Sequence, residues 1–187
     1  MDLTSQHYQT GIEGAAQGTS RLTRVLFAVY LVVLVWILVF KLGVRFSYME
    51  NRSVNLIPFS APARIHGQVE FSEMILNAII FLPVGIYAAS LFQRWSFLAK
   101  LFSCFCISFL CEAIQFIFRI GAFDVTDIIM NSFGGTIGVL TFMILKAILR
   151  DHLTAQKLVN MIALAGTILM IVLLVALKFG MLPIRYQ

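Results

Sequence analysis

Three carboxylate–amide pairs recur at helical spacing along a chain that is otherwise strongly apolar. The pairs are Glu73 with Asn77, Glu112 with Gln115, and Asp127 with Asn131. Residues three or four apart share one face of an α-helix, so each pair can act as a unit. Such groups can bind an amine or a guanidinium by charge-assisted hydrogen bonds. They can also coordinate a hard divalent cation, or exchange a proton where two acids are crowded together.

Two charged residues extend these faces. Arg119 follows Gln115 by four residues, and Asp124 precedes Asp127 by three. Successive helical residues turn by about 100°, so Ser108 also lies on the stripe that ends at Arg119. The candidate ligand-binding residues are Glu73, Asn77, Glu112, Gln115, Arg119, Asp124, Asp127 and Asn131.

The composition is that of a membrane protein. Of the 187 residues, 60% are hydrophobic and 12% are charged, and the mean hydropathy is +0.91. Soluble domains contain about 45–50% apolar and about 25% charged residues, so this chain has too few charges to cover a soluble surface. The net charge is +5. In so apolar a chain the basic residues mark loops and membrane edges, and no nucleic-acid partner is expected.

Five apolar stretches are long enough to cross a bilayer, which takes about 20 residues. Lipid offers backbone groups no hydrogen-bond partners, so each stretch must be helical. The sequence therefore predicts an all-α, polytopic transmembrane bundle with helices over 25–42, 74–92, 98–118, 127–149 and 158–178. The last of these is almost without polar residues and is expected to be a lipid-facing support. Residues 1–20 are polar and are predicted to be a loose, flexible tail before a transmembrane domain over 21–187.

This topology brings the three pairs to the same side of the membrane. The second helix enters on that side, the third exits there, and the fourth enters there again. Glu112 lies about two turns inside its helix, where a charge costs roughly 2.5–3.5 kcal/mol on insertion scales, so it should face the bundle and mark a functional site. The alternative is packing alone, because amides bond between helices and Gly134-x-x-x-Gly138 is a small-residue motif. Arg119 could then be an interfacial anchor.

The long loop over 43–73 lies on the same side as the three pairs. It is apolar but broken by Pro58 and Pro62, which suits an interfacial or re-entrant lid better than a crossing. Lys and Arg number seven on each side, so the positive-inside rule does not decide the orientation. The short loops on the other side are denser in positive charge, which favours a cytoplasmic N-terminus and an outward-facing pocket.

No metal site or resident cofactor is expected. The three cysteines fall within one predicted helix, without a histidine at ligand spacing, and are interpreted as packing residues: Cys104, Cys106 and Cys111. A divalent ion held by Glu73, Glu112 and Asp127 is the alternative.

Four fragments in order resemble the VanZ-like family: "NLIPF", "EFSEMILNAIIFLPVG", "SFLCEAIQFIF" and "DVTDIIMNSFGGTIG", covering about residues 55–140. The residues that fit the family's pattern in the second, third and fourth helices are Glu73, Asn77, Phe81, Pro83, Gly85, Glu112, Gln115, Asp124, Asp127, Asn131, Gly134 and Gly138. The family often has an arginine just before the acidic run and a further acid beside Asp127. Gly121, Ala122 and Thr126 occupy that region here.

The resemblance implies a multi-pass protein of the bacterial cell membrane, associated with tolerance of glycopeptide antibiotics, teicoplanin in particular. It implies membrane lipid as a partner, with a lipid-linked cell-wall precursor or an amphiphilic glycopeptide as the expected ligand. Binding or modulation is favoured over catalysis, since the chain lacks a nucleophile–base pair and a phosphate-cradling loop. An acid–base or metal-dependent enzyme acting on a lipid head group, and a small transporter, are the alternatives.

Overall fold

Five long helices make up most of the computed structural model, which describes residues 3–40, 54–59, 64–65, 68–69, 72–118 and 123–178. The helices are α1 (Leu3–Phe40), α2 (Ser72–Leu91), α3 (Phe97–Ile117), α4 (Val125–Leu149) and α5 (His152–Lys178). Each contains a span that is long and apolar enough to cross a membrane. The predicted all-α transmembrane bundle is therefore confirmed.

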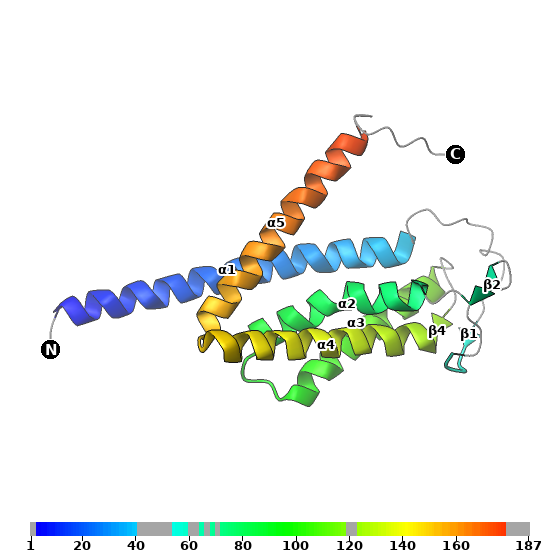
Figure 1. Cartoon of the computed structure of the whole chain (residues 1–187), viewed down its shortest axis with the longest axis horizontal. Helices are drawn as coiled ribbons and strands as arrows, with labels where there is room; N and C mark the ends of the chain where they lie inside the picture. Colours follow the sequence, from blue (N-terminus) through cyan, green and yellow to red (C-terminus); the bar gives the residue numbers. More distant parts are fainter. Residues whose placement is uncertain are drawn as a thin grey trace.

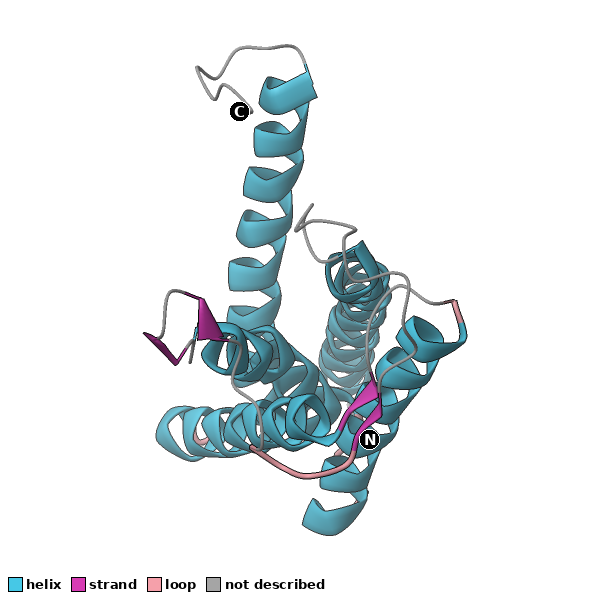
Figure 2. Cartoon of the chain, turned by 90° about the vertical axis from the view of Figure 1, so that its right-hand side faces the viewer, coloured by secondary structure: helices cyan, strands magenta, loops and turns pink. Residues whose placement is uncertain are grey.

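Helices α1 to α4 lie side by side, and α5 crosses α1 and then leaves the bundle (Figure 1). Seen from the strand-bearing end, α1 to α4 form a compact group from which α5 projects (Figure 2). Helices α3 and α4 run in opposite directions, whereas α5 leaves the end of α4 at a steep angle (Figure 1).

The first helix begins earlier than the sequence indicated. It runs unbroken from Leu3, and its apolar span starts at Ala16 rather than at residue 25. The stretch predicted as a loose tail is therefore helical. Thr19 within it accepts a hydrogen bond from the Asn160 side chain of α5, at 3.1 Å from the amide nitrogen. This contact with α5 lies at the end of the polar stretch, and the turns before it extend beyond α5 (Figure 1).

Helices α2 and α4 make the closest helix pair, and glycines make that approach possible. A Cβ atom at Gly134 would lie 1.9 Å from the carbonyl oxygen of Ala78, and one at Gly138 would lie 2.0 Å from that of Leu82. From the other side, a Cβ at Gly85 would lie 1.9 Å from the carbonyl oxygen of Gly135. The small-residue motif is thus a backbone-to-backbone contact, as in other membrane helix pairs.

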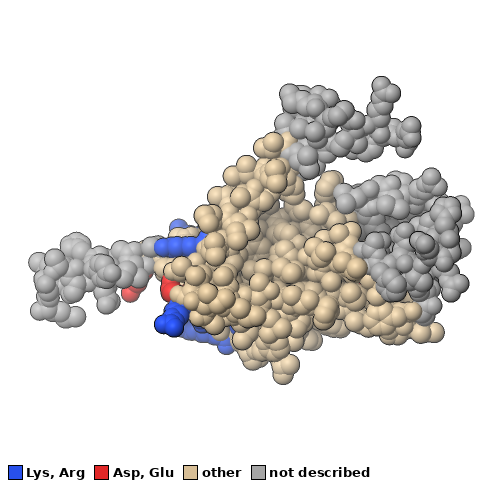
Figure 3. Space-filling view, viewed as in Figure 1, with Lys and Arg blue, Asp and Glu red and all other residues tan. Residues whose placement is uncertain are grey.

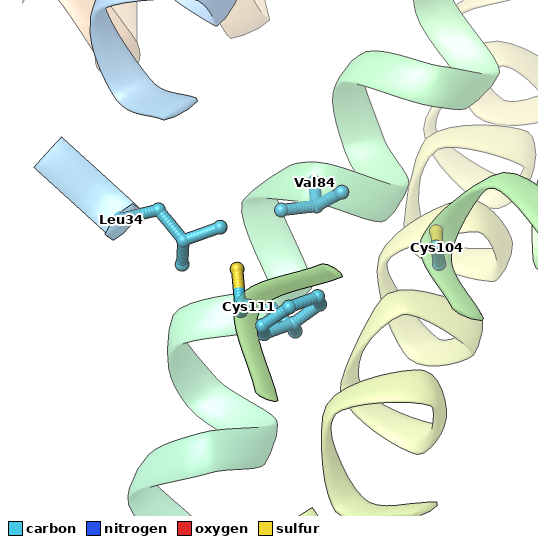
Figure 4. Close-up of a cluster of buried hydrophobic side chains, with 5 residues drawn as sticks. Leu34, Val84, Cys104 and Cys111 are labelled. Atoms are coloured by element: carbon cyan, nitrogen blue, oxygen red, sulfur yellow. The ribbon is translucent and has the colours of Figure 1, made fainter. Parts of the chain in front are cut away.

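The bundle centre is apolar. Leu34 of α1, Phe81 and Val84 of α2, and Cys104 and Cys111 of α3 form one buried cluster (Figure 4). Both cysteines are free thiols within this cluster, and Cys106 is also free. The interpretation of the buried pair as packing residues is confirmed.

Pro83 lies within α2, where its ring removes a backbone donor. The Tyr30 hydroxyl of α1 donates a hydrogen bond to the carbonyl of Ile80, three residues before the proline. The carbonyl that loses its helical donor to the proline is that of Ile79, so the bond from α1 reaches the carbonyl next to it.

A polar contact joins α5 to α1, where the sequence indicated an almost apolar support. Thr23 donates to the side-chain oxygen of Asn160 at 2.9 Å, and Gln156 donates to the Thr23 hydroxyl at 2.9 Å. All three side chains are buried. These hydrogen bonds lie in the first turns of α5, mostly before the predicted helix over 158–178, whose later apolar side chains are exposed as expected: Leu164, Ile168, Leu169, Ile171 and Val172.

Two short strand pairs lie at the end of the bundle away from the α4–α5 turn. β1 (Val54–Asn55) pairs in parallel with β4 (Phe123–Asp124), and β2 (Arg64–Ile65) pairs antiparallel with β3 (Gln68–Val69). The Lys and Arg side chains in view gather at the opposite end, around the α4–α5 turn (Figure 3). The described part of the chain therefore has a strand end and a basic end.

Candidate functional site

The strand end holds a group of polar side chains from three helices and two strands, which we call the polar cluster. Its members are Asn55, Asn77, Ser108, Glu112, Gln115, Asp124, Thr126, Asp127 and Asn131. Asn77 of α2 donates to the Oδ1 atom of Asp127 in α4, with 2.7 Å between the two atoms. The short distance fits a charge-assisted bond to a carboxylate. This contact joins two of the predicted carboxylate–amide pairs directly.

Glu112 links the third helix to the start of the fourth. Its side chain is 1% exposed, and its Oε2 atom accepts a hydrogen bond from the backbone N–H of Asp124 at 3.2 Å. The prediction that Glu112 faces the bundle rather than lipid is confirmed. A buried acid in an apolar helix needs hydrogen-bond donors from the protein. The backbone at the start of α4 supplies one of them to Glu112.

Asp124 begins α4. Its Oδ1 atom accepts from the backbone N–H of Thr126 at 2.7 Å, which satisfies one of the free N–H groups of the first helical turn. Its other oxygen, Oδ2, accepts from the side-chain amide of Asn55 at 3.1 Å. One carboxylate thus caps the helix and also holds the strand β1.

The segment 54–59 lies over the start of α4. Val54 and Asn55 pair with Phe123 and Asp124, and the backbone N–H of Phe59 donates to the Thr126 hydroxyl at 3.1 Å. This described part of the long loop contacts the polar cluster, as expected of a lid. Arg52, His66 and the side chain of Arg64, which belong to the same loop, lie outside the described residues.

Asn131 occupies the deepest position of the polar cluster. Its side chain is 0% exposed, and its amide nitrogen donates to the Ser108 hydroxyl of α3 at 2.9 Å. Its side-chain oxygen, also buried, has no hydrogen-bond partner. An unpaired buried acceptor costs roughly 1–3 kcal/mol, so this oxygen is suited to receive a donor from outside the protein.

Of the eight candidate residues, six have described side chains, and all six lie in the polar cluster: Asn77, Glu112, Gln115, Asp124, Asp127 and Asn131. Gln115 is buried on the same face of α3 as Ser108 and Glu112. The side chain of Glu73 and all of Arg119 lie outside the described residues. Sequence reasoning missed Asn55 and Thr126 as members, although Asn55 begins the "NLIPF" fragment and Thr126 lies within the acidic run.

The described part of the polar cluster is rich in acceptors. It contains three carboxylates, from Glu112, Asp124 and Asp127, while every Lys and Arg side chain described belongs to the basic end. Among described residues, no group of three or more histidine, cysteine or acidic side chains is arranged to hold a metal ion. The arrangement therefore favours a ligand that brings hydrogen-bond donors, and an amine most of all, because charged donors bond most strongly to carboxylates.

Comparisons with known proteins agree with this geometry. A family model described as VanZ/LLP1 matches residues 27–146, which include α2, α3 and nearly all of α4. The chain is 39% identical over 158 residues to Protein VanZ of Enterococcus faecium, an alignment that covers 82% of this chain and 91% of that protein. No solved structure matches.

Proposed function

The chain belongs to the VanZ/LLP1 family, and we propose that its polar cluster binds the donor-rich head of an amphiphile at the outer face of the bacterial cell membrane. The amphiphile is a lipid-linked cell-wall precursor or a glycopeptide such as teicoplanin. Occupation of the polar cluster reduces binding of the antibiotic to its target, and the host bacterium becomes more tolerant of the antibiotic. The protein is a VanZ-like, multi-pass membrane protein, which is the setting that this function needs.

The buried, unpartnered side-chain oxygen of Asn131 carries the proposal. It is fully buried beside Ser108 of α3 and one helical turn beyond Asp127, in a helix long and apolar enough to cross a membrane, and a buried acceptor without a partner is costly. A ligand amine or amide can pair with it and with Asp127 in the same site. Wall-precursor peptides and glycopeptides both present such donors on a molecule with an apolar anchor. The apolar part stays in the bilayer while the head reaches the polar cluster.

A packing role alone explains the amides less well. Asn77 and Asn131 do bond between helices, as glue residues would. The close α2–α4 approach, however, already rests on glycines that need no polar partner. Glu112, an acid in an apolar helix, adds a desolvation cost that packing does not require. A ligand that uses the acid explains why it is there.

The test is a tolerance assay with matched charge-removing variants. The chain is expressed in a teicoplanin-susceptible bacterium, and the minimal inhibitory concentration is measured for wild type, Glu112→Gln and Asp127→Asn. We expect wild type to raise it, and both variants to return it to the vector level, at unchanged protein abundance in the membrane. Asp151→Asn, which removes an exposed acid at the basic end, is the control and should behave as wild type.

Two results would contradict the proposal. Full tolerance in Glu112→Gln and Asp127→Asn would show that the carboxylates of the polar cluster are not used. A loss of tolerance that follows a loss of folded protein in both variants would favour the packing role.

A further inference from the structure

The segment 54–59, which lies over the polar cluster as a lid, carries apolar side chains that the proposed function does not use. Five of its six residues are apolar, and Asn55 is the exception. The lid bonds to the polar cluster through the Asn55 side chain and through the backbone N–H of Phe59. Its apolar side chains take no part in these bonds. They are all exposed, and we call them the lid tip: Val54, Leu56, Ile57, Pro58 and Phe59.

The lid tip is a continuous apolar patch rather than a scatter of single residues. Its four largest side chains are between 51% and 68% exposed, and no charged residue interrupts the segment. Single exposed apolar residues are normal on any protein, whereas a contiguous patch marks contact with a membrane or with another protein. The lid tip therefore needs a partner that the described residues do not supply.

The backbone of Phe59 adopts a conformation that suits glycine better than phenylalanine. Its φ angle is +59°, in the left-handed region. Bulky residues are rare there, because only glycine, and to a lesser extent asparagine and aspartate, adopt it at little steric cost. A turn with no other role would be more stable with glycine at this position. An exposed aromatic ring held on a strained backbone indicates that the ring itself has a partner.

The lid tip adjoins the exposed apolar surface of α3. Val54 pairs with Phe123 of β4 at the strand end (Figure 1). The Phe123 ring packs edge-on against Phe109 and Phe116 of α3, with 6.0 and 6.4 Å between ring centroids. Phe109 in turn stacks on Phe105, and both are exposed on a helix long and apolar enough to cross a membrane. The surface that α3 presents to lipid thus continues through Phe123 to the lid tip.

The lid also lies at the depth of the membrane surface. It pairs with residues 123–124, and the apolar span of α4 begins at the next residue, Val125. At the edge of a spanning segment the hydrocarbon core gives way to the head-group region, which is several ångströms thick on each side. An apolar segment at this level can bury its side chains in the boundary between head groups and acyl chains, as interfacial helices do.

We propose that the lid tip inserts into the lipid leaflet at the strand end and anchors the lid there. Burial of Leu56, Ile57 and Phe59 in lipid stabilises the lid and offsets the strained backbone of Phe59. The lid is then held on two sides, by lipid at its tip and by Asp124 and Thr126 of the polar cluster. The partner is the bilayer itself, so the proposal does not depend on which ligand the polar cluster binds.

Insertion is tested on the full-length protein in phosphatidylcholine nanodiscs. A nitroxide is attached to Ile57→Cys or, as the control, to Gln93→Cys in the exposed turn between α2 and α3, each in a background without the three native cysteines. Collisions of the nitroxide are measured with oxygen, which concentrates in lipid, and with a neutral nickel chelate, which stays in water. We expect oxygen collisions to dominate at position 57 and nickel collisions at position 93.

Two results would overturn the proposal. Dominance of nickel at position 57, as at position 93, would show that the lid tip lies in water. Low collision rates with both reagents at position 57 would show that protein, such as a second copy of the chain, covers the lid tip. The measurement uses no ligand, so its outcome is separate from that of the tolerance assay.

Substitutions at Phe59 then separate the anchor from the turn. Phe59→Asn removes the ring, tolerates the left-handed backbone and keeps the N–H that bonds to Thr126, so the turn is preserved. Phe59→Leu keeps an apolar side chain on the same strained backbone. We expect Phe59→Asn to shift the probe at position 57 toward nickel and Phe59→Leu to leave it near the wild-type value. Equal collision rates in the two variants would refute the Phe59 ring as an anchor.

Discussion

Placing a methyl group at Gly138 should separate α2 from α4 and disrupt the polar cluster at the same time. The added Cβ would lie 2.0 Å from the carbonyl oxygen of Leu82, and ordinary contact begins at 3.4 Å. The shortfall of 1.4 Å falls on backbone atoms of both helices, which no side-chain rotation can relieve. Overpacking of this kind costs about 1–3 kcal/mol. We therefore expect Gly138→Ala to lower the melting temperature clearly, and Gly138→Leu to prevent folding.

The same displacement reaches the candidate site. Asn77 and Asp127 belong to these two helices and are joined by a bond of 2.7 Å, so a separation of 1.4 Å would take the pair beyond hydrogen-bond range. Gly138→Ala should consequently lose tolerance activity even in molecules that remain folded.

Gly166→Ala is the matched control for this substitution. It is also a helical glycine, but a Cβ there would meet nothing within 4 Å. Alanine favours helix over glycine by up to about 1 kcal/mol, so this variant should melt at or above the wild-type temperature. Melting is followed in detergent by intrinsic tryptophan fluorescence. Equal melting temperatures for Gly138→Ala, Gly166→Ala and wild type would refute the close α2–α4 contact.

Three further predictions concern α5, pH and orientation. Asn160→Leu removes two hydrogen bonds between α5 and α1 and should lower the melting temperature. Each bond contributes about 0.6 kcal/mol to the free energy of unfolding in a membrane protein. Leu164→Ala, on the exposed face of α5, should have little effect. Hydrogen bonds from Thr154 hold the pKa of the Asp151 carboxyl below its usual value. The ionised carboxylate therefore stabilises the fold at pH values above the usual carboxyl pKa, and this stabilisation is lost as the pH falls through the lowered pKa. The melting temperature of Asp151→Ala should consequently depend less on pH in the acidic range than that of wild type. Single cysteines at Ser60 and Ser96, in a background without Cys104, Cys106 and Cys111, should react with an impermeant thiol reagent on intact cells at position 60 only. Labelling at 96 alone would place the polar cluster inside and exclude an outer-face ligand.

Hydropathy and helical spacing predicted the bundle and most of the polar cluster. Both are local properties: about 20 apolar residues define a crossing, and residues three or four apart share a face. The convergence of Glu112 with Asp124 and of Asn77 with Asp127 followed from the alternating direction of successive helices. The small-residue motif could also be predicted from the sequence, because Gly134 and Gly138 lie about one helical turn apart and so share a face of α4.

Contacts between segments far apart in the chain could not be predicted from the sequence. The pairing of Asn55 with Asp124 joins residues 69 apart, and two-residue strands carry no periodic signal. Thr23 and Asn160 are 137 residues apart, and each by itself resembles a polar residue at a membrane edge. The helical start of α1 was missed because its sequence from Leu3 is polar, and the contact of Thr19 with Asn160, 141 residues away, is not visible in a local pattern.

The most direct test of the central claim is binding of a defined ligand to the polar cluster. Wild type and Glu112→Gln, each in lipid nanodiscs, are titrated with a synthetic lipid-linked disaccharide–pentapeptide precursor and with teicoplanin, and bound mass is measured by native mass spectrometry. We expect wild type to bind at least one of the two saturably, and Glu112→Gln to bind it about tenfold more weakly, as the loss of a charged hydrogen bond predicts. Equal binding by the two proteins, or no saturable binding of either ligand to folded wild type, would contradict the account.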